Sequence, residues 1–309
     1  GKSSKIKQRK DARGSHIYLN PAQASPQKPS SNITLTLDHV IQEIAETALR
    51  KGIKKSEAKK GFAIVIDPHT GQILALANYP SFNPNRPLHN LEVTTNLALA
   101  ARFEPGSILK PFVIAQALEQ GVIGPHDIHH CTKAGKLEVS PGFYIHDDHP
   151  REFVNTEEII IHSSNICTFK ITRLLGKEKA YDTLKNFGFK APKKNLGLPG
   201  EESARISPWQ KWKDIRFANI SFGQGLLVTG LEMIQAYQAL INGGIKVRPY
   251  LIESMESAEG RTILPPPLPE SLPILNYQTS TYIKQALRKV VLSGTGKLAE
   301  SKIYSTAGK

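Results

Sequence analysis

The sequence predicts a mixed α/β (α+β) fold in which helices cover an antiparallel sheet. A β-hairpin carries this prediction, because two apolar runs, residues 62–66 and 72–78, flank the turn Asp67-Pro-His-Thr-Gly71. Both runs are apolar on both faces, so they belong inside a covered sheet. Apolar residues at helical spacing indicate the covering helices, which we expect at residues 39–51, 107–118, 156–162, 166–174, 178–188, 230–242 and 279–292.

Local signals place further elements along the chain. Asp38 and Thr229 precede helical segments and are predicted N-caps. Residues 250–253 follow a proline and have the composition of a strand. Residues 121–155 are rich in His, Gly and Asp, and we expect them to be the least regular part of the fold. The hairpin is expected to pack against the helix at 279–292.

Length and composition divide the chain into a short leader and one domain. Residues 1–30 are polar and basic with three prolines, which is typical of a linker or of the end of a preceding domain. Residues 31–309 are predicted to form the folded domain, and 309 residues suffice for a large core. Because the chain begins with Gly1, we expect it to be a piece of a longer protein.

Charge and hydropathy exclude some classes of protein. Hydrophobic content of 39% and charged content of 22% are typical of a soluble globular domain. The sequence contains no run of 18 or more apolar residues, the length needed to span a membrane. The net charge of +13 favours an anionic partner or surface. The basic residues are spread out and no nucleic-acid motif occurs, so we do not expect a nucleic-acid partner.

Cysteine and histidine leave two questions open at this point. Two cysteines are too few for a disulfide framework, and they permit either a reducing compartment or a periplasm. A group of possible metal ligands also occurs, although its spacing matches no zinc pattern and a solvated polar loop is the favoured interpretation. We predict no metal and no cofactor; the residues concerned are His126, His129, His130, Cys131 and the segment His146-Asp-Asp-His149.

A Ser-x-x-Lys sequence is the strongest candidate for chemistry. Ser107 and Lys110 lie after the turn Glu104-Pro-Gly106 and at the start of an apolar helix. Three residues on a helix rotate the chain by roughly 300°, so both side chains share one face. A lysine whose pKa is lowered by burial or by nearby positive charge can take the proton of a serine and activate it as a nucleophile. The N–H groups of the first helical turn could also stabilise an oxyanion.

A second short motif follows 56 residues later. Ser163-Ser-Asn165 stands between two predicted helices and offers a hydroxyl for proton relay and a carboxamide for holding a substrate amide. Alone it has the simpler interpretation of a helix cap. The two motifs together carry more weight than either one.

Taken in order, these motifs resemble the penicillin-recognising serine transpeptidases and β-lactamases, whose motif set is S-x-x-K, S-x-N and K-T-G. Lys309 stands where the third motif would open. The likeness covers about residues 32–309. It is strongest with class B penicillin-binding proteins of the division type (FtsI-like), in the segments Asp67-Pro-His-Thr-Gly-Gln-Ile-Leu-Ala75, Tyr79-Pro-Ser-Phe-Asn-Pro-Asn85, Glu104-Pro-Gly-Ser107, Phe222-Gly-Gln-Gly-Leu-Leu-Val-Thr229, Asn242-Gly-Gly244 and Gly294-Thr-Gly-Lys-Leu-Ala299.

The resemblance implies a penicillin-binding transpeptidase fold and acyl transfer on the D-Ala-D-Ala end of a peptidoglycan stem peptide. Ser107 is then the nucleophile and Lys110 its base. Ser163 returns the proton to the leaving D-Ala with help from Lys309, and Asn165 orients the substrate amide. β-Lactams would acylate Ser107. No cofactor is implied.

The resemblance also implies features of the whole protein. A membrane anchor and a pedestal domain would precede this domain, with residues 1–30 as the pedestal's remnant. The protein would stand on the outer, periplasmic face of the inner membrane and meet division proteins of the cell envelope. Because Lys309 is the last residue, we expect the strand that begins there and the strands after it to be missing, and the site to be incomplete.

Three alternatives remain. A serine β-lactamase or β-lactam sensor shares the fold, but a class A enzyme needs a deacylating glutamate followed by Leu-Asn, and the sequence around Glu201 has Arg205 where that asparagine would stand. A non-catalytic scaffold of the division machinery is the second, and a metal-binding module is the third. Glu232, where the family usually has Gln, is expected to be structural.

Overall fold

The computed structural model describes residues 9–10, 16–17, 31–87, 91–189, 196–257, 259–264 and 270–309. The chain forms two compact units. The smaller combines Gly1–Thr36 with Leu251–Leu268, and the larger combines Leu37–Tyr250 with Pro269–Lys309. All five predicted site residues belong to the larger unit.

The smaller unit contains a three-stranded antiparallel sheet in the order β14-β13-β3. Its strands are β3 (Asn32–Leu35), β13 (Ile252–Glu256) and β14 (Thr262–Leu264). The strand expected at 250–253 therefore begins two residues later. Within the leader, β1 (Arg9–Lys10) pairs with β2 (His16–Ile17), and the remainder of residues 1–30 lies outside the described residues. Its assignment as a linker or pedestal remnant stays a prediction.

The predicted hairpin is present in the larger unit as β4 (Gly61–Ile66) and β5 (Ile73–Tyr79), paired antiparallel. The Asp67 carboxylate closes the turn by accepting hydrogen bonds from the backbone N–H groups of His69 and Thr70, each at 2.8 Å. The bond from Thr70 and then the bond from His69 hold the pKa of Asp67 below its usual range, with the bond from Thr70 having the greater effect.

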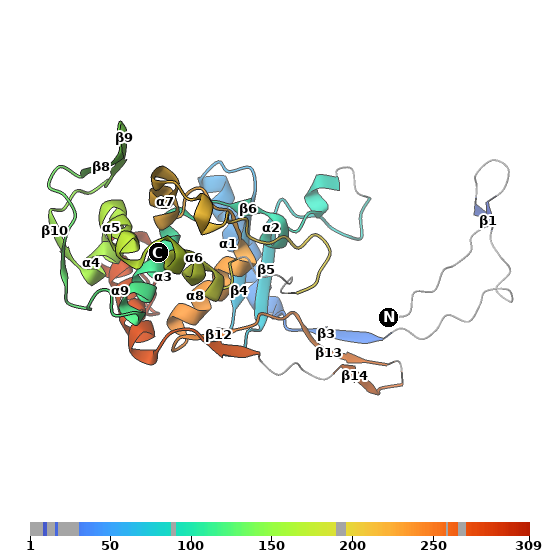
Figure 1. Ribbon diagram of the computed structural model, residues 1–309. Helices are drawn as coiled ribbons and strands as arrows, with labels where there is room; N and C mark the ends of the chain where they lie inside the picture. Colours follow the sequence, from blue (N-terminus) through green and yellow to red (C-terminus); the bar gives the residue numbers. More distant parts are fainter. Residues whose placement is uncertain are drawn as a thin grey trace. The chain divides into compact units, whose positions relative to one another are not determined.

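The helix that covers the hairpin is α1 (His39–Lys55), which packs against both strands (Figure 1). Asp38 caps it as predicted, accepting from the N–H groups of Val40 and Ile41. Small side chains on β5, Ala75 and Ala77, allow this close approach. The prediction that the hairpin packs against the helix at 279–292 is wrong, because the buried face of that helix joins the helical core instead.

That helical core is built around α3, which is buried along almost its whole length. Figure 1 shows α3 among α5, α6 and α9, and these helices contact it. The Phe112 ring of α3 makes edge-on contacts with Phe187, Phe189 and Tyr237. Besides α1, the described helices of the larger unit are α2 (Leu97–Ala100), α3 (Lys110–Glu119), α4 (Thr156–Ile161), α5 (Asn165–Leu175), α6 (Lys177–Asn186), α7 (Asp214–Ser221), α8 (Gly230–Ile241) and α9 (Tyr277–Leu292).

Short antiparallel pairs connect these helices. β6 (Arg102–Phe103) pairs with β11 (Val228–Thr229), and β12 (Ile245–Val247) pairs with β15 (Ser271–Pro273). Single 3₁₀ turns complete the connections: η2 (Leu91–Thr94), η3 (Gly106–Leu109), η4 (Trp209–Lys211) and η5 (Lys297–Ala299).

Residues 121–155 are more regular than predicted. β7 (Ile128–His130) pairs with β10 (Phe153–Asn155), and β8 (Lys136–Ser140) pairs with β9 (Phe143–His146). The prediction of an irregular segment is wrong because polar and charged residues on exposed strand faces masked the strand signal.

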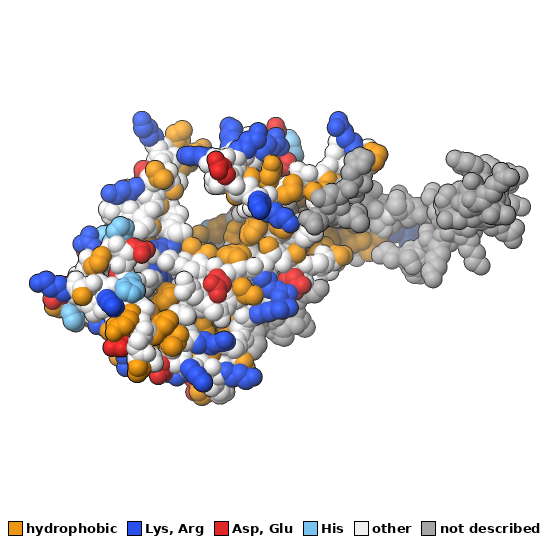
Figure 2. All heavy atoms as spheres, turned by 90° about the horizontal axis from the view of Figure 1, so that it is seen from above, with side chains coloured by type: hydrophobic (Ala, Val, Ile, Leu, Met, Phe, Trp, Pro, Cys, Tyr) orange, Lys and Arg blue, Asp and Glu red, His pale blue; other side chains and the backbone are white. Residues whose placement is uncertain are grey.

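Surface charge matches the sequence-based picture. Figure 2 shows Lys and Arg side chains distributed over the visible face, with Asp and Glu between them, rather than gathered in one stripe. Across the parts of the chain that the structure describes, none of the helices combines the length and the apolar character needed to cross a bilayer.

Candidate active site

Ser107 lies on a sharp turn that leads into the central helix. It is part of η3, and α3 begins three residues later with Lys110. Gly106 adopts φ +56°, in the left-handed region that favours glycine, which lets the chain turn before the serine. The Ser107 side chain is exposed, whereas Lys110 is fully buried. The predicted nucleophile and its predicted base therefore share one turn.

A turn between α7 and β11, which contains Gly223 and Gly225, packs against the Ser107 turn. The Gly106 N–H donates to the Gly223 carbonyl at 2.9 Å. A Cβ atom at Gly223 would lie 2.1 Å from the Gly106 oxygen, so only glycine fits this approach. The Gly225 N–H donates to the Glu104 carboxylate at 2.8 Å. The close approach to Gly106 requires glycine at position 223, whereas at position 225 the positive φ of +75° favours it.

Lys110 reaches the second motif directly. Its Nζ donates to the Ser163 carbonyl at 2.5 Å and to the Ser163 Oγ at 3.1 Å. The pKa of Lys110 is lowered from 10.5 to about 7, first by burial and then by the positive charge of Lys309. Asp147 and Asp148 oppose this shift. A large fraction of Lys110 is thus neutral near pH 7 and able to accept a proton.

Ser163 occupies a strained position between α4 and α5. Its φ of +61° is unusual for a residue other than glycine. Ser164 caps α5 by accepting from the Cys167 N–H at 3.0 Å, so the helix-cap interpretation of this motif is confirmed for the middle residue. Asn165 is the first residue of α5, and its Nδ2 donates to the His146 carbonyl at 2.7 Å. The motif thus caps α5 and also contacts Lys110.

Asp147 holds this motif in place, a role that the sequence analysis missed. Its buried carboxylate accepts from the Ser164 hydroxyl at 2.6 Å and from the N–H groups of Asn165 and Ile166 at 2.5 and 3.0 Å. A carboxylate suits this end of a helix because the unpaired N–H groups there carry partial positive charge. The sequence signal was the acidic pair at 147–148, which had been considered only as possible metal ligands.

Cys131 and Cys167 form a disulfide with an S–S distance of 1.94 Å. It removes Cys131 from the group of possible metal ligands. His129 has another partner, since its Nε2 lies 2.9 Å from the Thr156 hydroxyl. Among the residues that the structure describes, no cluster of three or more His, Cys, Asp or Glu side chains could hold a metal ion.

Lys309 completes the predicted set. Its Nζ donates to the Ile160 carbonyl in the last turn of α4 at 2.6 Å, and the preceding Gly308 N–H donates to the Leu287 carbonyl of α9. Burial lowers the pKa of Lys309 to about 8. The Lys309 charge acts on Lys110, so these two predicted residues share one electrostatic environment.

The two glutamates weighed in the sequence analysis are structural. Glu201 is buried and its carboxylate accepts from the N–H groups of Leu196 and Gly197 at 2.8–3.2 Å. Glu232 forms a capping box with Thr229 and also accepts from the Ala204 N–H at 2.8 Å. Burial raises the pKa of Glu232 despite these bonds.

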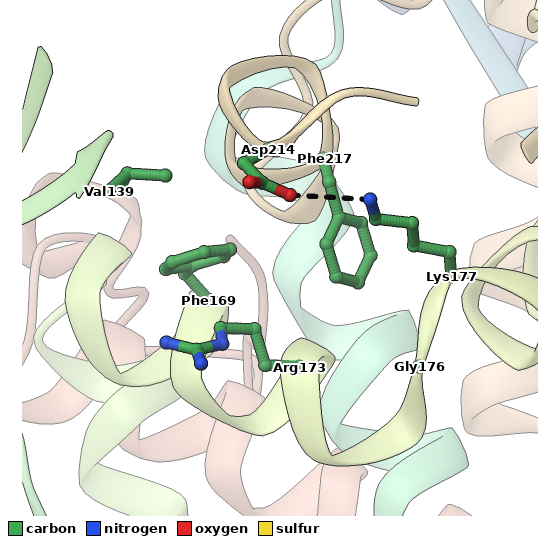
Figure 3. Close-up of a pocket in the computed structure, with 7 residues that line it drawn as sticks. All are labelled: Val139, Phe169, Arg173, Gly176, Lys177, Asp214 and Phe217. Atoms are coloured by element: carbon green, nitrogen blue, oxygen red, sulfur yellow. Dashed lines mark hydrogen bonds and ion pairs between the residues drawn. The ribbon is translucent and has the colours of Figure 1, made fainter. Parts of the chain in front are cut away.

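A separate pocket of about 360 Å³ lies between β8, α5, α6 and α7. Figure 3 shows Phe169 and Phe217 in its wall and Lys177 directed at Asp214, with which it forms an ion pair at 3.3 Å. None of the five predicted site residues lines it.

An exposed serine, a buried lysine of lowered pKa three residues later and a second serine in contact with that lysine are the groups that a serine acyl transfer would use. The family model described as "Penicillin binding protein transpeptidase domain" matches residues 61–309 of the chain. The chain belongs to this family.

Named relatives and a solved structure agree with that assignment. The chain is 36% identical over 227 residues to "Probable peptidoglycan D,D-transpeptidase PenA" of Neisseria gonorrhoeae, with 73% of this chain and 38% of PenA covered. It is 31% identical over 290 residues to "Penicillin-binding protein PbpB" of Mycobacterium tuberculosis, with 90% of this chain and 42% of PbpB covered. The chain therefore spans less than half the length of these relatives.

The fold agrees as well. The crystal structure of penicillin binding protein 3 from Mycobacterium tuberculosis complexed with ampicillin superposes with a TM-score of 0.79 at 30% identity. The match covers 88% of this chain and 62% of that chain. The predicted mixed α/β, penicillin-binding transpeptidase fold is confirmed.

Proposed function

We propose that the protein is a peptidoglycan D,D-transpeptidase that works through an acyl-enzyme on Ser107. The observation that carries the proposal is the hydrogen bonding of the buried Lys110 Nζ to the Ser163 backbone and hydroxyl. This contact joins the activating base to a group that can pass its proton onward. The name of the relative PenA, a probable peptidoglycan D,D-transpeptidase, supports the same reaction.

The first half of the reaction breaks the D-Ala-D-Ala peptide bond. Neutral Lys110 takes the hydroxyl proton of Ser107, whose oxygen attacks the penultimate carbonyl. As the tetrahedral intermediate collapses, Ser163 relays the proton from Lys110 to the nitrogen of the leaving D-Ala. The acyl group stays on Ser107 as an ester. The amine of a second stem peptide then attacks this ester and restores the serine.

Two further residues are proposed to position the substrate. The Nδ2 of Asn165 is held by the His146 carbonyl, which directs the Oδ1 of the same carboxamide toward a substrate N–H. Lys309 contributes positive potential for the terminal carboxylate of the substrate, and its charge adds to the effect of burial in lowering the pKa of Lys110. β-Lactams are proposed to acylate Ser107, as the ampicillin complex of the similar structure suggests.

The setting of the whole protein is part of the proposal. We infer a role in septal cell-wall synthesis from the division-type segment Glu104-Pro-Gly-Ser107, with division proteins of the envelope as partners. The periplasmic face of the inner membrane, reached by a single-pass anchor in the full-length protein, is the proposed location. The cysteine count left open a reducing compartment or a periplasm. The disulfide supports the periplasm, because disulfides persist in oxidising compartments.

Hydrolysis of β-lactams is less well supported than transpeptidation. A class A β-lactamase uses a glutamate to direct water at the acyl-enzyme. The Glu201 carboxylate instead binds the backbone of its own loop.

A labelling experiment on the full-length protein tests the proposal. A fluorescent penicillin should attach covalently, with the modified peptide containing Ser107. Ser107→Ala should abolish the label, while Ser81→Ala, at an exposed serine outside both motifs, should leave it unchanged. Labelling that persists in Ser107→Ala would refute the nucleophile, and rapid turnover of the acyl-enzyme would indicate a β-lactamase.

A further inference from the structure

We propose that the Cys131–Cys167 disulfide is a positioning element of the active site, which fixes the Ser163-Ser-Asn165 turn for the acyl-transfer step. The inference rests on the proposed function, because it concerns the residues assigned to proton relay and substrate orientation. It adds two residues that belong to none of the three motifs.

The disulfide is in contact with this turn, through Ser164. Cys167 stands two residues after Asn165 in the first turn of α5, and Cys131 follows β7. Both cysteines are buried, and the Cys131 sulfur lies 3.6 Å from the Ser164 hydroxyl. The same hydroxyl caps α5 and donates to Asp147. Ser164 is thus the point where the disulfide, the helix cap and the buried carboxylate meet.

The covalent link also closes the loop that contains the motif. The two cysteines are 36 residues apart, and the enclosed segment includes Asp147, α4 and the motif itself. Noncovalent contacts brace the same junction, because the Lys170 Nζ of α5 donates to the carbonyls of His130 and Cys131 at 2.8 and 2.7 Å. The Cys131 N–H donates to the Glu152 carbonyl, which ties in the chain before β10.

The backbone of Ser163 explains why such bracing matters. A non-glycine residue in the left-handed region persists only where the surroundings impose that conformation. Here the surroundings include the Ser164 N–H bond to the Ile159 carbonyl at 3.1 Å, the Asp147 carboxylate, the Ser164 cap and the disulfide. If the disulfide opens, the backbone at Ser163 can relax. The two Ser163 oxygens that accept hydrogen bonds from the Lys110 Nζ then move with it. A shift of about 1 Å at such a site can cost on the order of a hundredfold in rate.

The test measures acylation of the full-length protein by a fluorescent penicillin at several concentrations, which separates non-covalent binding from the acylation rate constant. Cys131→Ala/Cys167→Ala is compared with wild type at a temperature where both are fully folded. We expect the acylation rate constant to fall by about ten- to a hundredfold, because the reacting groups lose their alignment. Non-covalent affinity should change by less than about threefold, since most of the binding surface is untouched.

A matched variant separates positioning from general loss of stability. Leu184→Ala removes a buried side chain of α6 and lowers the melting temperature without touching the motif. It should acylate at the wild-type rate constant below its melting temperature. Equal slowing of Leu184→Ala and the double variant would overturn the proposal, and so would wild-type acylation by the double variant.

Reduction of the wild-type protein provides a second route if the double variant does not fold. Dithiothreitol supplies two electrons and two protons, converts the disulfide into two thiols and closes to its own cyclic disulfide. Alkylation and mass spectrometry then count the thiols. Slower acylation of the reduced fraction, with faster hydrogen exchange at Asn165, Ile166 and Cys167, supports the proposal. An unchanged rate constant in fully reduced protein refutes it. Failure of oxidised wild type to label at Ser107 would instead refute the proposed function.

Discussion

The two halves of the candidate active site, the Ser107 turn and the Ser163 turn, are held by different contacts. The turn that carries Ser107 rests on backbone contacts, above all the approach of Gly106 to Gly223. The turn that carries Ser163 has one backbone bond, from the Ser164 N–H to the Ile159 carbonyl, but it rests mainly on side chains from a segment up to 32 residues earlier, namely the Asp147 carboxylate and the Cys131 sulfur. Lys110 joins the two halves through its bonds to Ser163.

This difference determines how each half should respond to change. A turn held mainly by backbone approach fails when a side chain is added at a glycine. A turn held by a buried carboxylate is weakened by a substitution that removes the charge, even when the side-chain volume hardly changes. The predictions below test this contrast, from the largest expected effect to the smallest.

Lys110→Arg should cause the largest loss of function because it affects the link between the halves. Arginine remains protonated at all accessible pH values, so it cannot take the serine proton. Loss of a general base lowers rates by about 100- to 10,000-fold. Penicillin acylation kinetics measure the effect, with Lys284→Arg on α9 as the control that should behave as wild type. Acylation of Lys110→Arg within tenfold of wild type would refute the assigned base.

Gly223→Ala should destabilise the Ser107 half most strongly. The residue has φ +87°, and its new Cβ would lie 2.1 Å from the Gly106 carbonyl oxygen. Backbone strain and overpacking together predict a loss of about 2–5 kcal/mol in the free energy of unfolding, together with slower acylation.

Gly225→Ala is the matched control, because this glycine has φ +75° but no atom closer than 4.0 Å to the added Cβ. It should cost only the conformational strain of about 1–2 kcal/mol. Denaturant unfolding compares the two variants. If both lose the same free energy, the close approach to Gly106 contributes nothing.

Asp147→Asn should weaken the Ser163 half by a smaller amount. One of the N–H or O–H donors that now meet the carboxylate would face an amide NH₂, and hydrogen bonds to a charged group contribute about 1.5–3 kcal/mol. We expect an acylation rate constant lowered by about tenfold, measured under the same conditions as for the disulfide variants.

The pH profile adds an independent measure of the same variant. In wild type the acylation rate should fall as pH drops through about 7, because Lys110 becomes protonated there. Asp147 raises the pKa of Lys110, so Asp147→Asn should move this acid limb to lower pH. Asp148 acts on Lys110 in the same direction from an exposed position, so Asp148→Asn should shift the limb without slowing the plateau. A limb that moves to higher pH in either variant would contradict this electrostatic account.

The same contrast explains what could be predicted from the sequence. The Ser107 turn, its glycines and the hairpin are recognisable because each depends on residues that are close in sequence or belong to known motifs. Asp147 and the disulfide could not be assigned, because their roles exist only once the chain folds so that β9 lies against α5. The position of α9 was misjudged for a related reason, since an amphipathic pattern shows that a helix face is buried but not which neighbour buries it.

Tyr237→Phe should have the smallest effect and sharpens the comparison. The Tyr237 hydroxyl on α8 donates to the Ile108 carbonyl at 2.8 Å, inside the Ser-x-x-Lys turn. Burial raises the pKa of Tyr237, so the hydroxyl stays neutral and remains a donor. Its loss should cost about 1 kcal/mol, measured by urea unfolding, because one buried carbonyl loses its partner.

Acylation of Tyr237→Phe should remain within about threefold of wild type, since the backbone contacts of Gly106 still hold the turn. Tyr282→Phe is its matched control: that hydroxyl donates to the Pro125 carbonyl at 2.8 Å, in a residue outside both motifs. The two variants should lose similar stability, and neither should approach the rate loss of Asp147→Asn. A tenfold slower Tyr237→Phe would show that side chains also govern the Ser107 half, and the contrast between the two halves would fail.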